Sequence, residues 1–272
     1  MIPVIPLAGH AVSRLIIGGN PFSGNSHVSP ELDSEMQDYF TTENVKKTLF
    51  RCMECGINTM QLRADKHIMR IIREFHQEGG RMNWIAQTTP ESKSFDGSIH
   101  QLCAYDPIAI YHHGTELDAL FKDGQYDEIQ RRLGVIRGTG KLVGLGTHMP
   151  EVIEYAEQHH WDIDFYMASV HNLSKVSRVS SATTGIANQD EPFDDEDRSL
   201  MYAAIRSTDK PCLAFKILGA TRKCQSPATV RAAFAEAFAN IKPTDAIVVG
   251  MYPKASDQVY QNAAFVREIL EA

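Results

Sequence analysis

The chain has 272 residues, of which 43% are hydrophobic and 22% are charged, and its formal net charge is −7 at pH 7. This length suits one α/β domain with a core of ordinary size, whereas two separate domains would each be small. The acidic balance, and the lack of a dense Lys/Arg stripe with interleaved aromatics, argue against nucleic-acid and anionic-membrane partners. We therefore expect a small-molecule ligand, and the composition leaves a homo-oligomer open.

The N-terminal segment and the cysteines indicate the compartment. No charged n-region followed by a long apolar run opens the chain, and no stretch approaches the roughly 20 apolar residues that span a bilayer. The five cysteines are an odd number without a secretory signal, so reduced thiols are expected. Cys52 and Cys55 form a CxxC, but they lie inside an apolar helical pattern, which favours core packing. These features predict a cytoplasmic protein.

Short apolar, β-branched runs alternate with helix-period segments along the chain. The runs predict strands at 15–17, 58–62, 83–86, 108–111, 142–145, 164–170, 212–217 and 246–249. The segments between and after them predict helices at 42–55, 67–77, 95–104, 116–139, 150–160, 195–207, 226–240 and 256–271. Ser226 followed by Pro227 is typical of a helix start.

This alternation predicts the fold class. Strands that alternate with helices pair in parallel, and eight such units in this length favour a single (β/α)8 TIM barrel domain over residues 1–272. A doubly wound sheet is the alternative, but the segment Gly18-Gly19-Asn20 lacks the third glycine of a dinucleotide fingerprint.

One connection is unusually long. Residues 172–199, after the sixth predicted strand, are polar and rich in Ser and Thr. Lys175 and Arg178 lie near the start of this segment, and an acidic stretch at 190–197 lies near its end. Loops of this length are usually functional lids or disordered segments. We weigh a candidate lid and a solvated surface strip equally.

Three histidines end consecutive predicted strands. In a TIM barrel the chemistry lies at the carboxyl ends of the strands, so His113, His148 and His171 are expected on one arc of the barrel mouth. Imidazole is the commonest ligand of zinc and similar metals, so these residues predict a site for zinc, manganese or iron. The alternative for each is a hydrogen-bonded structural histidine. A one-residue slip would place His112 in the site instead of His113.

Two cations are further candidates for chemistry. A lysine buried at a barrel mouth loses its charge readily, so Lys216 in LAFKILGA is a candidate Schiff-base nucleophile or general base. Its alternative is a permanently charged residue that holds a carboxylate or phosphate, or that pairs with Glu116 or Asp65. Arg63 is expected to bind an anionic or polyhydroxyl substrate group, because its fork suits carboxylate and phosphate geometry. An ion pair with Asp65 is the alternative for Arg63.

The strand-end motifs RLIIGGNPF, GINTMQLRAD, IAIYHHG, GKLVGLGTH, FKILGA and AIVVGM resemble the aldo-keto reductase superfamily over nearly the whole chain, including an N-terminal hairpin. The resemblance implies a barrel that binds NADP or NAD and reduces a carbonyl with an Asp, Tyr, Lys and His tetrad. The Asp falls on Gln61, the Tyr at or beside Lys66, the Lys on Gln87 or Thr88, and the His on His113. Of the four tetrad residues, only the His is matched, by His113. Candidate cofactor-binding residues are Asn20, Lys254 and Asn262.

Three hypotheses follow for the function. The first is a non-redox lyase, isomerase or hydrolase that acts on a sugar-like or hydroxy-acid substrate, with His113, Lys216, Arg63 and Asp65 as candidate catalytic residues and metal or acid/base assistance. The second is an atypical NAD(P)-dependent oxidoreductase with His113 as the acid. The third is a non-catalytic ligand-binding barrel.

Overall fold

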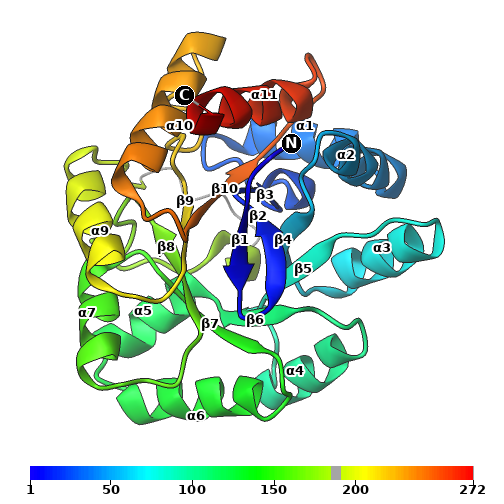
Figure 1. Ribbon diagram of the computed structural model, residues 1–272. Coiled ribbons are helices and arrows are strands. Elements are labelled where there is room, and N and C mark those ends of the chain that lie inside the picture. Colours follow the sequence, from blue (N-terminus) through cyan, green and yellow to red (C-terminus); the bar gives the residue numbers. More distant parts are fainter. Residues whose placement is uncertain (185–190, 272) are drawn as a thin grey trace.

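The computed structural model describes residues 1–184 and 191–271, and in this part of the chain eight parallel strands close into a barrel (Figure 1). Around the barrel the strands follow the order β10-β3-β4-β5-β6-β7-β8-β9. Their bounds are β3 Leu15–Gly18, β4 Thr59–Arg63, β5 Asn83–Gln87, β6 Ala109–His112, β7 Leu142–Thr147, β8 Phe165–Ser169, β9 Cys212–Phe215 and β10 Ala246–Gly250. The predicted (β/α)8 barrel is confirmed.

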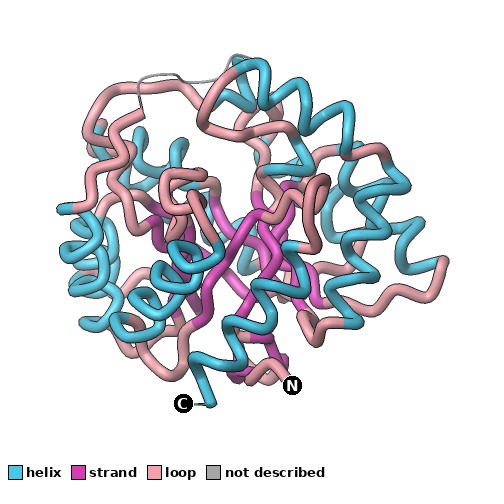
Figure 2. Tube along the Cα trace, turned by 90° about the horizontal axis from the view of Figure 1, so that it is seen from above, coloured by secondary structure: helices cyan, strands magenta, loops and turns pink. Residues whose placement is uncertain are grey.

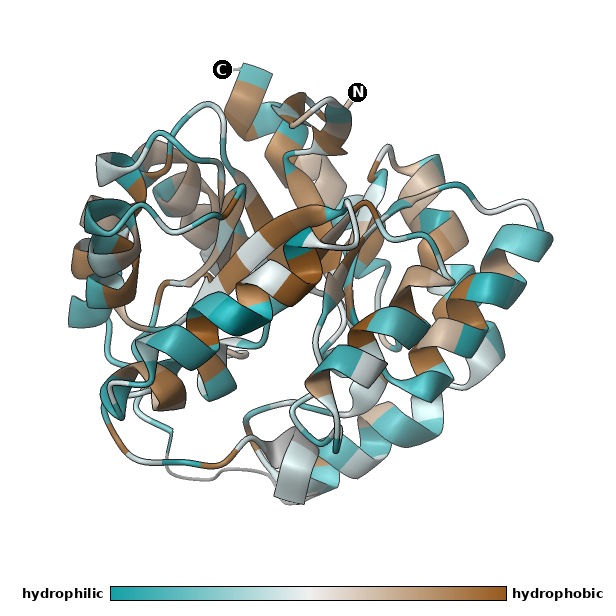
Figure 3. Ribbon diagram, turned by 90° about the horizontal axis from the view of Figure 1, so that it is seen from below, coloured by the Kyte–Doolittle hydropathy of each residue, from teal (hydrophilic) through white to brown (hydrophobic). Residues whose placement is uncertain are grey.

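The strands are apolar on both faces, as a helix-covered parallel sheet requires. Every residue of β3 and of β8 is buried. Figure 3 shows the central strands in the hydrophobic colour, whereas the surrounding helices also carry hydrophilic residues. The core therefore has a part inside the barrel and a part between the strands and the helices, and the side chains at the strand ends remain for the site.

Helices surround the strands on all sides (Figure 2). Their bounds are α1 Pro30–Tyr39, α2 Thr42–Glu54, α3 Lys66–Gln77, α4 Phe95–Cys103, α5 Gly114–Lys122, α6 Tyr126–Arg137, α7 Pro150–Gln158, α8 Ser181–Thr184, α9 Glu196–Ser207, α10 Pro227–Asn240 and α11 Gln258–Glu271, with a short 3-10 turn η1 Pro21–Ser23. The predicted start of α10 is confirmed, because the Ser226 side chain accepts a hydrogen bond from the Thr229 amide.

Three of the differences from the prediction have a local cause in the chain. The single helix predicted at 116–139 is two helices, α5 and α6, because the chain turns between them at Gly124, which adopts a left-handed φ of 67°. The prediction has no helix at α1, although Ser29 caps it and Pro30 begins it. The seventh barrel strand ends at Phe215, before the predicted 217, because Lys216 has a φ of 61° that a strand does not tolerate.

The N-terminal hairpin closes one end of the barrel. Strands β1 Val4–Leu7 and β2 His10–Ser13 pair antiparallel, which confirms the expected hairpin. Ile5, Leu7 and Val12 share one buried cluster with residues of the barrel strands, among them Ala109, which begins β6. The hairpin therefore fills the amino end of the barrel and leaves the carboxyl end open for a site.

The predicted lid segment 172–199 is only partly described. Its residues 185–190 lie outside the described residues. The two flanking parts are tied to each other by ion pairs, with Lys175 Nζ 2.5 Å from Asp197 Oδ1 and Arg178 paired with Glu191.

The structure also bears on the expectations about the two cysteines and about membrane-spanning segments. Cys52 and Cys55 both lie in the hydrophobic core, as predicted. Over residues 1–184 and 191–271, none of the helices has the length and hydropathy that a membrane crossing requires.

Candidate active site

A cavity of about 500 Å³ lies at the carboxyl ends of the barrel strands. Six of the residues predicted for a site line this cavity: Asn20, Arg63, His113, His148, Lys216 and Asn262. Asp65, His171 and Lys254 are not among the described residues that line it. The barrel mouth thus brings together most of the predicted set, drawn from six different strand ends and helices.

Lys216 is a cavity residue with an unusual backbone conformation. It directly follows β9 and adopts a φ of 61°, a left-handed conformation that costs a non-glycine residue free energy. Its Nζ lies 2.9 Å from Nε2 of His27, and Nδ1 of His27 lies 2.5 Å from Oε2 of Glu191. Asn20 Nδ2 also lies 3.2 Å from the same His27 Nε2. Lys216, His27 and Glu191 form one hydrogen-bonded chain, called here the lysine relay.

The charges around the relay fix its protonation. Burial, together with the positive charges of Arg178 and Arg222, lowers the pKa of Lys216 to about 7, although Glu191 opposes the shift. Burial and the neighbouring Lys216 lower the pKa of His27 to about 4. Burial opposes ionisation of Glu191, but the hydrogen bond from His27 and the nearby cations lower its pKa to about 2. At neutral pH Glu191 is a carboxylate, His27 is neutral, and Lys216 is in part a free amine.

These protonation states assign the direction of each hydrogen bond. The Glu191 carboxylate can only accept, so His27 donates from Nδ1 and keeps the Nε2 lone pair as an acceptor. Lys216 therefore donates to His27 Nε2. His27 and Glu191 were missed by sequence reasoning because both lie in connections. His27 follows η1, and Glu191 was noted in the sequence only as part of the acidic stretch at 190–197.

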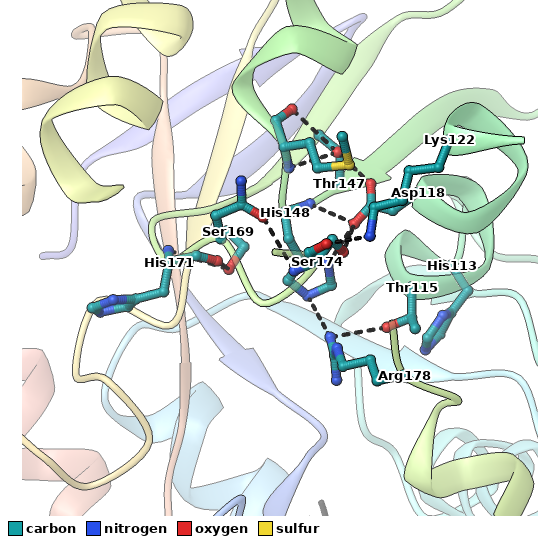
Figure 4. A network of polar contacts seen from close by, with 12 residues as sticks. His113, Thr115, Asp118, Lys122, Thr147, His148, Ser169, His171, Ser174 and Arg178 are labelled. Carbon is teal, nitrogen blue, oxygen red and sulfur yellow. Dashed lines mark hydrogen bonds and ion pairs between the residues drawn. The ribbon is translucent and has the colours of Figure 1, made fainter. Parts of the chain in front are cut away.

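A second network surrounds His148 at the end of β7. Asp118 on α5 is fully buried and accepts from Thr147 Oγ1 at 2.5 Å, from Ser174 Oγ at 2.6 Å, and from both the backbone N and the Nδ1 of His148 at 3.0 and 2.8 Å. On the other side of the ring, His148 Nε2 lies 3.4 Å from Arg178 Nη2. Figure 4 shows Asp118 and Arg178 on opposite sides of the His148 ring. Asp118 was not predicted either.

The structure shows which of the two adjacent histidines, His112 or His113, faces the cavity. His113 lines the cavity, and its buried Nδ1 has no hydrogen-bond partner among the described residues. His112 stacks on Phe95 with ring centroids 5.4 Å apart, and its Nε2 lies 3.2 Å from Arg132 Nη1 on the outer side. His113 is therefore the histidine that faces the site.

The three predicted histidine ligands do not converge. Nδ1 of His171 lies 3.0 Å from the carbonyl oxygen of Asp194, and its Nε2 lies 3.4 Å from the Arg198 guanidinium. No group of three or more His, Cys, Asp or Glu side chains in the described part of the chain is arranged to hold a metal ion. In the described part of the chain, His171 turns toward the Asp194 carbonyl, so His113, His148 and His171 do not lie together as the prediction expects.

The reductase tetrad is not restored by the fold. Gln61, at the position of the family's Asp, donates from Nε2 to Tyr111 Oη at 2.8 Å. Burial raises the pKa of Tyr111 well above its ordinary value, so this tyrosine is a poor acid. Lys66 begins α3 and is not among the described lining residues. The residues at this site do not fit the proton-donating part of nicotinamide-dependent carbonyl reduction.

The remaining predicted charged residues, Arg63, Asp65 and Lys254, are engaged in ion pairs. Arg63 Nε lies 3.0 Å from Asp65 Oδ2, and its Nη2 pairs with Glu91. Asp65 also caps α3 by accepting from the Ile68 amide. The structure therefore shows the ion pair that was the alternative for Arg63, and adds Glu91. Lys254 is exposed and lies 2.8 Å from Glu35 Oε1.

Comparison with known proteins supports the fold but does not indicate a particular reaction. No family model matches the chain, and no curated protein matches it. Solved structures match at low identity. They include a truncated 3-deoxy-D-arabino-heptulosonate 7-phosphate synthase from Thermotoga maritima (TM-score 0.57, 15% identity, covering 100% of this chain and 92% of that one). They also include an aldo-keto reductase from Bacillus halodurans in its holo form (TM-score 0.55, 10% identity, 99% and 96%) and a glycerol dehydrogenase from Gluconobacter oxydans (TM-score 0.54, 11%, 99% and 94%).

This likeness shows the fold alone. Aldo-keto reductases are among the proteins with the same barrel, and so is a synthase of another class, so the relationship holds at the level of the TIM barrel.

Proposed function

We propose that the protein is a non-redox enzyme that acts on a small anionic carbonyl compound, sugar-like or a hydroxy or oxo acid, through an imine formed on Lys216. The observation that carries the proposal is the lysine relay, in which the Nζ of a cavity lysine lies 2.9 Å from a neutral imidazole acceptor. An amine becomes a nucleophile only when it has lost its proton, and desolvation beside other cations is the usual way to achieve this.

The relay supports each proton transfer of imine formation. The Lys216 nitrogen attacks the carbonyl carbon and forms a C–N bond, and the proton that the nitrogen sheds passes to His27 Nε2. The carboxylate of Glu191, 2.5 Å from His27 Nδ1, stabilises the imidazolium that results. His27 returns this proton to the oxygen, which gives a carbinolamine. His27 then carries the second N–H proton to the hydroxyl, which leaves as water while the C=N bond forms. One carbonyl and one amine give one imine and one water.

The lining of the cavity favours an anionic, oxygen-rich substrate. Arg178, whose side chain is 9% exposed, and Lys216 lie near one another beside the carboxylate of Glu191, and Arg222 adds another nearby cation. Gln61, Gln87 and Thr115 contribute neutral polar groups to the same cavity. Guanidinium groups suit carboxylates and phosphates, and amides and hydroxyls suit substrate hydroxyls.

Borohydride trapping tests the proposal. The protein is incubated separately with pyruvate and with dihydroxyacetone phosphate, sodium borohydride is added to reduce the C=N bond to a stable secondary amine, and the adduct is mapped by peptide mass spectrometry. We expect one adduct, on Lys216, that is absent in Lys216→Met and retained in Lys254→Met, a matched control at an exposed lysine outside the cavity lining. Adducts spread over surface lysines, or none above the Lys216→Met background, contradict the proposal.

A further inference from the structure

A buried carboxylate fixes the orientation of the His148 ring. Asp118 is 1% exposed and accepts four hydrogen bonds, from Thr147, Ser174 and two groups of His148. A buried ionised group is stable only when its acceptor positions are satisfied in this way. Because Asp118 acts as the acceptor, Nδ1 of His148 carries the proton and Nε2 keeps its lone pair.

The opposite edge of this ring, which carries Nε2, faces the cavity that Lys216 also lines. Burial lowers the pKa of His148, and the positive charges of Arg178 and Lys216 lower it further, although Asp118 opposes the shift. The ring is therefore neutral at pH 7. The contact between Nε2 and Arg178 Nη2 is long, at 3.4 Å, so the Nε2 lone pair is only weakly engaged.

A purely structural role for the His148 ring explains this arrangement less well than a catalytic role does. The turn after β7 is already held without the ring, because the Asp118 carboxylate accepts from the His148 backbone N and Thr147 Oγ1 also lies 3.3 Å from the Met149 carbonyl oxygen. The imidazole adds a second hydrogen bond to the same carboxylate and presents a basic nitrogen to the cavity. A carboxylate on one ring nitrogen and a cavity-facing lone pair on the other, with only the long Arg178 contact beside it, is the arrangement of an oriented general base.

We infer that His148, positioned by Asp118, moves a proton to and from the carbon next to the substrate carbonyl after the substrate is bound to Lys216. This inference rests on the proposed function and narrows it to carbonyl compounds that carry a hydrogen on that neighbouring carbon. In the imine protonated on the Lys216 nitrogen, His148 Nε2 takes the C–H proton, and the C–H electron pair forms a C=C bond. The C=N electrons return to the Lys216 nitrogen, which gives a neutral enamine. The reverse step returns a proton to the same carbon, so no oxidant or co-reactant is consumed.

Hydrogen exchange on a substrate reports this step directly. The protein is incubated with pyruvate in deuterated buffer at neutral pH, the loss of the methyl proton signal is followed by NMR, and borohydride trapping is run on the same sample. We expect wild-type protein to exchange the methyl protons. In His148→Gln, we expect exchange to fall by about 100-fold or more, the usual contribution of a general base, while trapping on Lys216 is retained.

A second variant separates chemistry from folding. His148→Ala leaves a space beside Asp118, and added imidazole is expected to restore part of the exchange, which a merely structural histidine would not allow. Retained trapping shows that each variant is folded and binds the probe. Rescue that is absent while trapping persists overturns the inference.

The outcomes distinguish the two claims. Wild-type protein that shows no trapping contradicts the proposed function and removes the basis of the inference. Trapping with unchanged exchange in His148→Gln contradicts only the role of His148. Loss of trapping together with exchange in that variant also overturns the inference, because His148 would then act on the imine or on the fold rather than on the neighbouring carbon.

Discussion

Removing the charge of Glu191 should shift the pH at which Lys216 becomes reactive. The carboxylate and the ammonium lie at the two ends of the lysine relay, joined by hydrogen bonds of 2.5 and 2.9 Å with one imidazole ring between them. The charges are thus at most about 8 Å apart, and an effective dielectric constant of about 20 gives an attraction of about 2 kcal/mol. This attraction favours the ammonium form, so Glu191→Gln should lower the pKa of Lys216 by about one unit or slightly more.

The shift starts from the pKa of Lys216 in the wild-type protein, which its surroundings lower. With a pKa of about 7, about three quarters of Lys216 is free amine at pH 7.5, against about 0.1% for a lysine at the ordinary value of 10.5. The assay is the rate of borohydride trapping with pyruvate between pH 5 and 9. We expect a midpoint near 7 for wild-type protein and near 6 for Glu191→Gln.

A matched control separates the charge from the contact. Glu191→Asp keeps the charge beside His27 and Arg178, so its midpoint should stay near that of the wild type. A midpoint that rises in Glu191→Gln, or that moves equally in both variants, would refute the electrostatic reasoning.

Three further predictions concern stability and cofactors. Lys216→Gly should raise the free energy of unfolding by about 1 kcal/mol in urea denaturation while it abolishes trapping, because glycine adopts a φ of 61° without strain; a loss of stability would argue that the lysine side chain holds the loop. Asp118→Asn should lower the free energy of unfolding by about 3 kcal/mol, since it disrupts a buried carboxylate with four hydrogen bonds, and an unchanged melting curve would count against that network. Dialysis against a chelator should leave trapping on Lys216 unchanged, because the relay contains no metal ligand set, and a trapping rate that recovers only on adding zinc, manganese or iron would restore the metal hypothesis.

The barrel was predictable because its signal is repeated along the chain. Buried strands such as β8 read as continuous apolar runs, and helix starts such as Ser226-Pro227 carry local caps. The exceptions are local. Gly124 divides a helix that reads as continuous, and the positive φ of Lys216 ends a strand that the sequence extends to 217. Neither conformation is visible in a hydrophobic pattern.

The site was predictable only where it lies on strand ends. His113, His148 and Lys216 follow strands, so barrel geometry alone brings them to the cavity. His27 and Glu191 come from connections whose paths no periodicity describes, and the lysine relay therefore could not be assembled from sequence. The same limit explains His171, which follows a strand but turns toward the carbonyl of Asp194.

The central claim is that Lys216 is a free amine at neutral pH, and competitive labelling measures this without a substrate. The protein is treated at pH 7 with a limiting amount of formaldehyde and cyanoborohydride, and the methylation of each lysine is quantified by peptide mass spectrometry. The relay predicts that Lys216 is labelled well before exposed lysines such as Lys47 and Lys254, and that this preference disappears at pH 5. Labelling of Lys216 at or below the rate of those exposed lysines would contradict the account.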